Sequence, residues 1–133
     1  MNQNFYDKLN NVIAKDSILT DEPMSRHTTF RVGGPADFFV TPKAKEEVRD
    51  VIRICKEAGM PYYIIGNGSN LLVSDAGYRG VIVQIYKEMN EVKVEGDLVK
   101  AQSGALLSGI AAKALGAELS GFEFASGIPG TIG

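Results

Sequence analysis

Three stretches of the chain repeat their apolar residues with the period of an α-helix. The first spans residues 4–15, the second runs from Thr41-Pro42 to just before Gly59, and the third spans Leu107 to Gly116. Within each stretch the apolar positions recur at three- and four-residue intervals, so they share one helix face. Threonine followed by proline suits a helix start, and glycine suits a helix end. The sequence therefore predicts three amphipathic helices.

Short runs of β-branched and aromatic residues predict strands at residues 28–32, 36–40, 62–65 and 81–83. Residues 91–95 and 98–102 alternate apolar and polar side chains around Gly96-Asp97, which is typical of a β-hairpin. A loop is expected at residues 21–23. The order strand, helix, strand predicts a crossover connection packed on a sheet.

Composition narrows the classes of protein that the chain can represent. Its 133 residues suit one domain or part of a larger one, and 44% hydrophobic with 23% charged residues is typical of globular proteins. A formal net charge of -2 gives no basic footprint for nucleic acid, and no apolar run reaches the roughly 20 residues of a membrane helix. The N-terminus lacks the layout of a signal peptide. One cysteine and one histidine exclude an internal disulfide, argue against a zinc site and fit a reducing cytoplasm.

Charge is sparse in the final third of the chain. Residues 101–133 contain three charged side chains and seven glycines. Such a stretch has few polar side chains to face the solvent, so we expect its backbone to lie against a ligand or against more protein.

The loop Gly66-Asn67-Gly68-Ser69-Asn70 directly follows an apolar strand. Its glycines allow positive φ and close approach to the backbone, and successive N–H groups in such a turn can bind phosphate. An ordinary strand-end turn is the alternative, because the lysine of a Walker loop and the third glycine of a dinucleotide fingerprint are absent.

Two further segments are candidates for contact with a ligand. Residues 126–133 carry three glycines and a proline, so a flat ring or a diphosphate could lie against their backbone; a flexible chain end is the alternative. Ser103-Gly104-Ala105 lies between a strand and a helix, where the helix N-terminus could face an anion; a simple connection is the alternative.

The isolated chemistry-bearing side chains favour structural roles. His27 has no nucleophile or acid pattern beside it, and Cys55 lies on the apolar stripe of its helix. Arg26 and Arg31 could reach a phosphate, although solvated or salt-bridged arginines are the more common case.

Three segments together resemble the UDP-N-acetylenolpyruvoylglucosamine reductase (MurB) family of peptidoglycan precursor synthesis. They are residues 27–37 (HTTFRVGGPAD), residues 65–72 (IGNGSNLL) and residues 121–133 (GFEFASGIPGTIG), and the similarity extends over essentially the whole chain.

The resemblance implies an α+β fold: an FAD-binding domain of the p-cresol methylhydroxylase/vanillyl-alcohol oxidase type, with its first subdomain and part of the second. It implies FAD as cofactor, NADPH as hydride donor and a UDP-sugar substrate. The charge, the short apolar runs and the single cysteine and histidine lead us to expect no nucleic-acid partner, no membrane and no metal. The residues that it implies for FAD binding are Gly66, Asn67, Gly68, Ser69, Asn70, Leu71, Ser103, Gly104, Ala105, Ser126, Gly127, Ile128, Pro129, Gly130 and Thr131. Gly68→Val is expected to abolish flavin retention with less effect on the fold.

The chain is shorter than members of that family. We expect residues 1–28 to form an N-terminal helix and lead-in and residues 29–133 to form an incomplete FAD-binding domain, without the substrate-binding domain. The family's catalytic residues would then lie beyond Gly133, so no residue here inherits a catalytic role and the chain alone is expected to be inactive. A stand-alone, non-enzymatic nucleotide-binding module that uses residues 66–70 is the alternative.

Overall fold

The first part of the molecule is a four-stranded sheet built from the short apolar runs of the chain. Strands β1 (Ile18–Pro23), β2 (Pro35–Val40), β3 (Tyr62–Ile65) and β4 (Tyr78–Gln84) lie in the order β1-β2-β4-β3. Strand β1 pairs antiparallel with β2, whereas β2, β4 and β3 are parallel. The two central strands are covered on both faces, which explains why their sequences are almost continuously apolar.

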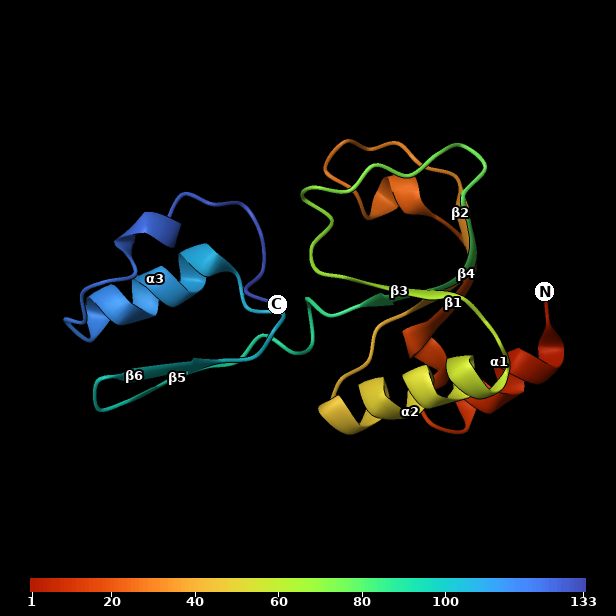
Figure 1. Cartoon of the computed structure of the whole chain (residues 1–133), viewed down its shortest axis with the longest axis horizontal. Helices are drawn as coiled ribbons and strands as arrows, with labels where there is room; N and C mark the ends of the chain where they lie inside the picture. The colour runs from red at the N-terminus through yellow and green to blue at the C-terminus, as the bar shows by residue number, and fades with distance from the viewer.

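Two helices cover one face of this sheet (Figure 1). They are α1 (Gln3–Asn10) and α2 (Lys45–Glu57). Phe5 and Leu9 from α1 join Val51 and Cys55 from α2 in one buried cluster with β-strand residues such as Phe38. Because α2 connects β2 to β3, its buried stripe holds the parallel strands in place.

Loops cover the opposite face of the sheet. The short 3-10 helix η2 (Met24–Arg26) and the segments 27–34 and 66–77 lie there (Figure 1). Met24 packs with Phe39 and Ile82 in a second buried cluster. This face therefore presents loops, rather than helices, to whatever approaches it.

A smaller second part follows β4. It contains the hairpin strands β5 (Val92–Glu95) and β6 (Leu98–Ala101), helix α3 (Leu107–Gly116) and the 3-10 turn η3 (Glu123–Ala125). The last residues return toward the first part, so that the C-terminus lies between the two parts (Figure 1). An isolated bridge pairs Leu106 with Thr131, and the Gly133 N–H donates to the Ser103 carbonyl at 2.9 Å.

The three predicted helices all form, the third with its predicted bounds and the first two with shifted ones. The first is shorter than residues 4–15, and the second begins at Lys45 rather than at Thr41-Pro42. Instead of a threonine cap, the Glu47 carboxylate accepts a hydrogen bond from the Lys43 N–H near the helix start. Gly59 ends the helix in the left-handed region, at φ 62°, as expected of a C-terminal glycine.

The prediction of a strand at residues 28–32 is wrong. These residues form a turn in which the Thr28 hydroxyl donates to the Val32 carbonyl at 3.0 Å and Arg31 has φ 55°. The edge strand is instead β1, which includes the predicted loop at residues 21–23. The pairing of β1 with β2 stabilises an extended conformation that its own polar residues do not favour.

The computed structural model describes all residues from 1 to 133. No helix combines the length and the apolar content that crossing a bilayer requires.

Burial should make Cys55 unreactive in the folded protein. The side chain has no exposed surface, and desolvation raises the pKa of its thiol to about 11. At pH 8 only about 0.1% of such a thiol is thiolate, which is the reactive form. We expect a maleimide or disulfide reagent to label Cys55 only after urea unfolds the chain. A Cys55→Ala chain that carries Ser120→Cys, an exposed position, is the control and should react at once. Rapid labelling of native Cys55 would contradict the buried position.

Candidate functional site

The loop at residues 66–70 leaves the carboxyl end of strand β3. Gly68 has φ 70°, in the left-handed region, and the Asn67 side chain accepts a hydrogen bond from the Ser69 N–H at 3.3 Å. Ligands of open parallel sheets bind outside the carboxyl ends of the strands, where this loop lies.

Four N–H groups of this loop are free. Those of Gly66, Asn67, Gly68 and Asn70 donate to no acceptor within the chain. Backbone N–H groups seldom stay without a partner, and a run of them in one turn forms a concavity suited to an anion. The loop can therefore offer several donors to one ligand.

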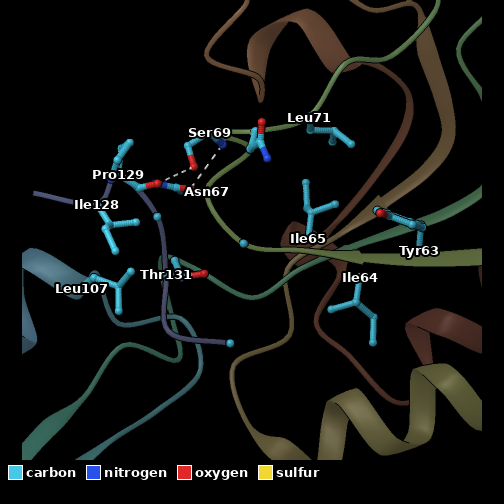
Figure 2. A pocket seen from close by; sticks show the side chains of 15 residues that line it. Tyr63, Ile64, Ile65, Asn67, Ser69, Leu71, Leu107, Ile128, Pro129 and Thr131 are labelled. Carbon is cyan, nitrogen blue, oxygen red and sulfur yellow. Dashed lines mark hydrogen bonds between the residues drawn. The ribbon is translucent and has the colours of Figure 1, made fainter. Parts of the chain in front are cut away.

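The C-terminal segment lies against the same loop. The Ser69 hydroxyl donates to the Pro129 carbonyl at 3.0 Å (Figure 2). A Cβ added at Gly66 would overlap the Thr131 hydroxyl, so the absent side chain is what lets the two segments touch. Residues sixty positions apart thus share one site.

These two segments lie on the wall of an open hollow of about 310 Å³, here called the loop hollow. Its lining residues are Tyr63, Ile64, Ile65, Gly66, Asn67, Gly68, Ser69, Asn70, Leu71, Leu107, Ile128, Pro129, Gly130, Thr131 and Gly133.

The lining of the loop hollow contains no charged side chain. Helix α3 begins there with Leu107, and its N-cap residue Leu106 makes no side-chain capping bond. The N–H groups of Ser108 and Gly109 in the first turn also have no acceptor in the chain. Free amides and the positive end of a helix dipole therefore supply the only favourable potential for an anion.

Not every predicted site residue lines the loop hollow. The N–H groups of Gly104 and Ala105 donate to the carbonyls of Met89 and Gln102, and both residues line a separate hollow of about 570 Å³. Ser126 lies in a groove beside α3, and Gly127 is exposed. The helix starts at Leu107, so residues 103–105 precede its free amides rather than supplying them. For residues 103–105, Ser126 and Gly127, contact with flavin stays a prediction.

Several lining residues are absent from the set that the sequence predicts. Tyr63 and Ile64 are 53% and 45% exposed because β3 is an edge strand of the sheet, whereas the apolar run by itself predicts a buried strand. Leu107 and Gly133 also line the loop hollow. The exposure of these two consecutive residues could be found only from the strand order, which leaves β3 at an edge of the sheet.

Gly68 lies against backbone rather than open space, and this corrects the expected effect of Gly68→Val. A Cβ there would overlap the His27 carbonyl oxygen, and the Thr29 N–H donates to the Gly68 carbonyl at 3.1 Å. Any side chain at Gly68 would therefore push apart the loop and residues 27–29, so that the fold itself would be damaged.

His27 is held in a structural contact. Its Nε2 lies 2.9 Å from Glu22 Oε1, and its ring stacks on Phe39 with centroids 3.9 Å apart. Arg26 also pairs with Glu22, at 3.6 Å. These contacts fasten residues 26–29 to the sheet and so support the carbonyl that Gly68 packs against.

The fold and the loop together define an α+β domain whose glycine-rich turn leaves several backbone N–H donors free. The profile of the FAD-binding domain family matches residues 36–133, and the chain belongs to that family. This agrees with the predicted fold class of the p-cresol methylhydroxylase/vanillyl-alcohol oxidase type, which is confirmed.

The whole chain is similar to UDP-N-acetylenolpyruvoylglucosamine reductases. The protein of that name from Clostridium botulinum is 52% identical over 135 residues, which cover all of this chain and 44% of that protein. The one from Clostridioides difficile is 48% identical over 132 residues, covering 99% of this chain and 43% of that protein. The chain thus spans less than half the length of the curated relatives that it matches.

Solved structures share the fold. UDP-N-acetylenolpyruvylglucosamine reductase (MurB) from Thermus caldophilus superposes with a TM-score of 0.67 at 33% identity, covering 84% of this chain and 38% of that one. A p-cresol methylhydroxylase structure gives a TM-score of 0.65 at 19% identity, over 88% of this chain and 25% of that one, and shows likeness of fold alone.

The Ser69–Pro129 hydrogen bond should hold the C-terminal segment on the loop. We expect Ser69→Ala to speed amide hydrogen exchange at Leu107 and Ile132, whose N–H groups donate to Gly130 and Ala105 within the same contact. Loss of one neutral hydrogen bond corresponds to about 1 kcal/mol, or roughly fivefold faster exchange. Ser126→Ala, which removes only a local bond to the Glu123 carbonyl, is the control. Equal exchange in both variants would show that Ser69 does not join the two segments.

Proposed function

We propose that this chain is the N-terminal, FAD-binding part of a UDP-N-acetylenolpyruvoylglucosamine reductase. The observation that carries the proposal is the set of free N–H groups at residues 66–70, in a loop that lines one hollow together with residues 128–131. Membership of the FAD-binding domain family and 52% identity over the whole chain to a reductase of that name support it.

The residues of the loop hollow fit an FAD molecule. The diphosphate would take the free amides of residues 66–70 and the start of α3. No acidic side chain lines the hollow to repel it. Ile64, Leu107 and Ile128 would meet an apolar part of the cofactor. When bound, FAD supplies the capacity to accept a hydride and pass it on.

The residues of this chain would bind and orient the cofactor rather than perform the chemistry. Amides fixed by the Ser69–Pro129 and Thr29–Gly68 contacts are preorganised, so binding need not reorder the loop. Apolar side chains along β3 and residues 128–132 would exclude water from the cofactor's buried side. Of the predicted set, Leu71 and residues 128–131 line the hollow with the loop, and residues 103–105, Ser126 and Gly127 remain part of the proposal.

The proposed reaction of the whole protein is reduction of the enolpyruvyl group of a UDP-sugar with NADPH, giving UDP-N-acetylmuramate in the cytoplasm for peptidoglycan synthesis. The groups that protonate and bind the substrate would be supplied by residues other than these 133. Within the chain, residues 29–133 would form the FAD-binding domain and residues 1–28 its lead-in. The complete gene product should oxidise NADPH only when the enolpyruvyl sugar is present. The alternative of a stand-alone nucleotide-binding module has less support, because the chain matches reductases over its whole length.

Flavin titration tests the role of the loop. The fluorescence of each flavin is followed as it is titrated with the protein, and we expect the emission of FAD to change on binding. Riboflavin should bind at least about tenfold more weakly, because only FAD brings a diphosphate to the free amides. Equal affinity for FAD and riboflavin would show that the loop does not bind the diphosphate.

Asn70→Asp should weaken FAD binding through charge alone. Asn70 is exposed at the edge of the loop hollow and makes no side-chain hydrogen bond, so a carboxylate there would repel the diphosphate without disturbing the fold. We expect about tenfold weaker binding at low salt, with part of the loss recovered at high salt. Asn4→Asp, an exposed position on α1, makes the same charge change far from the loop and should leave the affinity unchanged. An equal effect of both substitutions would refute the assignment.

A further inference from the structure

A second hollow lies on the other side of Asn67, between the loop and residues 26–31. It has a volume of about 370 Å³ and shares only Asn67 with the loop hollow. We call it the Arg31 pocket. Its lining residues are Arg26, His27, Thr28, Thr29, Arg31, Asn67, Gln84, Tyr86 and Lys87.

The Arg31 pocket is positively charged. Three of its lining side chains are cationic, and none is acidic. Arg26 is partly neutralised by Glu22, which lies behind the lining at 3.6 Å. Arg31 and Lys87 form no ion pair, so their charges are available to a ligand. This contrasts with the loop hollow, which has no charged side chain in its lining.

Gln84 supplies a second and independent observation. It ends strand β4, is only 5% exposed, and its side-chain amide makes no hydrogen bond within the chain. No side-chain polar atom of the molecule is both fully buried and unpaired, so the Gln84 amide must reach solvent, and the Arg31 pocket is the hollow that it lines. The amide has no protein partner to give up, so it is free to hydrogen-bond a ligand oxygen that enters the pocket in place of water.

The backbone beside the pocket is also unusual. Arg31 has φ 55°, a conformation that costs a non-glycine residue free energy, and its N–H donates to the Thr28 carbonyl at 3.1 Å. The Thr28 hydroxyl closes the same turn on Val32. The turn therefore keeps Arg31 in a fixed place beside Lys87 and Gln84.

We propose that the Arg31 pocket binds a phosphoryl group of a nucleotide. An arginine fork, a lysine and an amide N–H₂ are donors that match the oxygens of phosphate. Asn67 connects this pocket to the free amides of residues 66–70. The phosphoryl group could come from FAD or from a separate phosphorylated ligand, and the same chemistry would bind either. The proposal does not require that the loop hollow binds FAD.

Inorganic pyrophosphate is the probe. It is titrated into the ¹⁵N-labelled chain, and shifts of the Arg31, Gln84 and Lys87 amides are followed by NMR. We expect Arg31→Gln and Lys87→Gln each to weaken this binding about tenfold, as loss of a charge-assisted hydrogen bond predicts. Lys56→Gln, an exposed lysine on α2, removes the same charge elsewhere and should change nothing. Absence of shifts at millimolar pyrophosphate, or equal weakening in all three variants, would overturn the proposal.

A second titration identifies the source of the phosphoryl group. With FAD bound at saturation, loss of the pyrophosphate shifts would assign the pocket to the cofactor's own phosphates. Shifts that persist would assign it to a separate phosphorylated ligand. If the chain binds pyrophosphate in the Arg31 pocket but does not bind FAD, the proposal for this pocket stands and the flavin assignment fails.

Discussion

The candidate site depends on two missing side chains. At Gly66 and Gly68 the space that a Cβ would fill is taken by the Thr131 side chain and by the His27 carbonyl, respectively. The loop is thus clamped between a segment that precedes it by forty residues and one that follows it by sixty. In this position its N–H groups have no acceptor within the chain, and they remain available to a ligand. The close contacts at Gly66 and Gly68 thus both pack the loop into the fold and hold it in the conformation that leaves its N–H groups free.

The loop also joins the two parts of the molecule. Few hydrogen bonds hold the C-terminal segment: Ser69 to Pro129, Leu107 to Gly130, Ile132 to Ala105, and Gly133 to Ser103. All four have a backbone carbonyl as acceptor, and only the first joins the segment to the loop. A ligand that bridges residues 66–70 and 128–131 would add to these contacts, so cofactor binding and association of the two parts should stabilise each other.

The two hollows that meet at Asn67 offer different groups to an anion. The loop hollow relies on backbone amides and a helix start and has an apolar wall, which suits a ligand with a flat ring beside its phosphates. The Arg31 pocket relies on side-chain charge and the buried amide of Gln84. The loop hollow would select a ligand by its shape and orientation, whereas the Arg31 pocket would select it by its negative charge. Together they would give a nucleotide contacts on both sides of one short loop.

Local chemistry was sufficient to predict much of this molecule. The apolar stripes predicted three helices, glycine predicted the end of α2, and the run of glycine, asparagine and serine predicted a turn able to meet an anion. These features depend on residues close together in the chain, so the local sequence pattern is enough to predict them. Strand β1, the turn at residues 28–32 and the exposure of Tyr63 and Ile64 depend instead on which strands become neighbours. The contact of residue 69 with residue 129, and of Gly68 with His27, exists only once the chain has folded, because no local preference encodes a distance between remote segments.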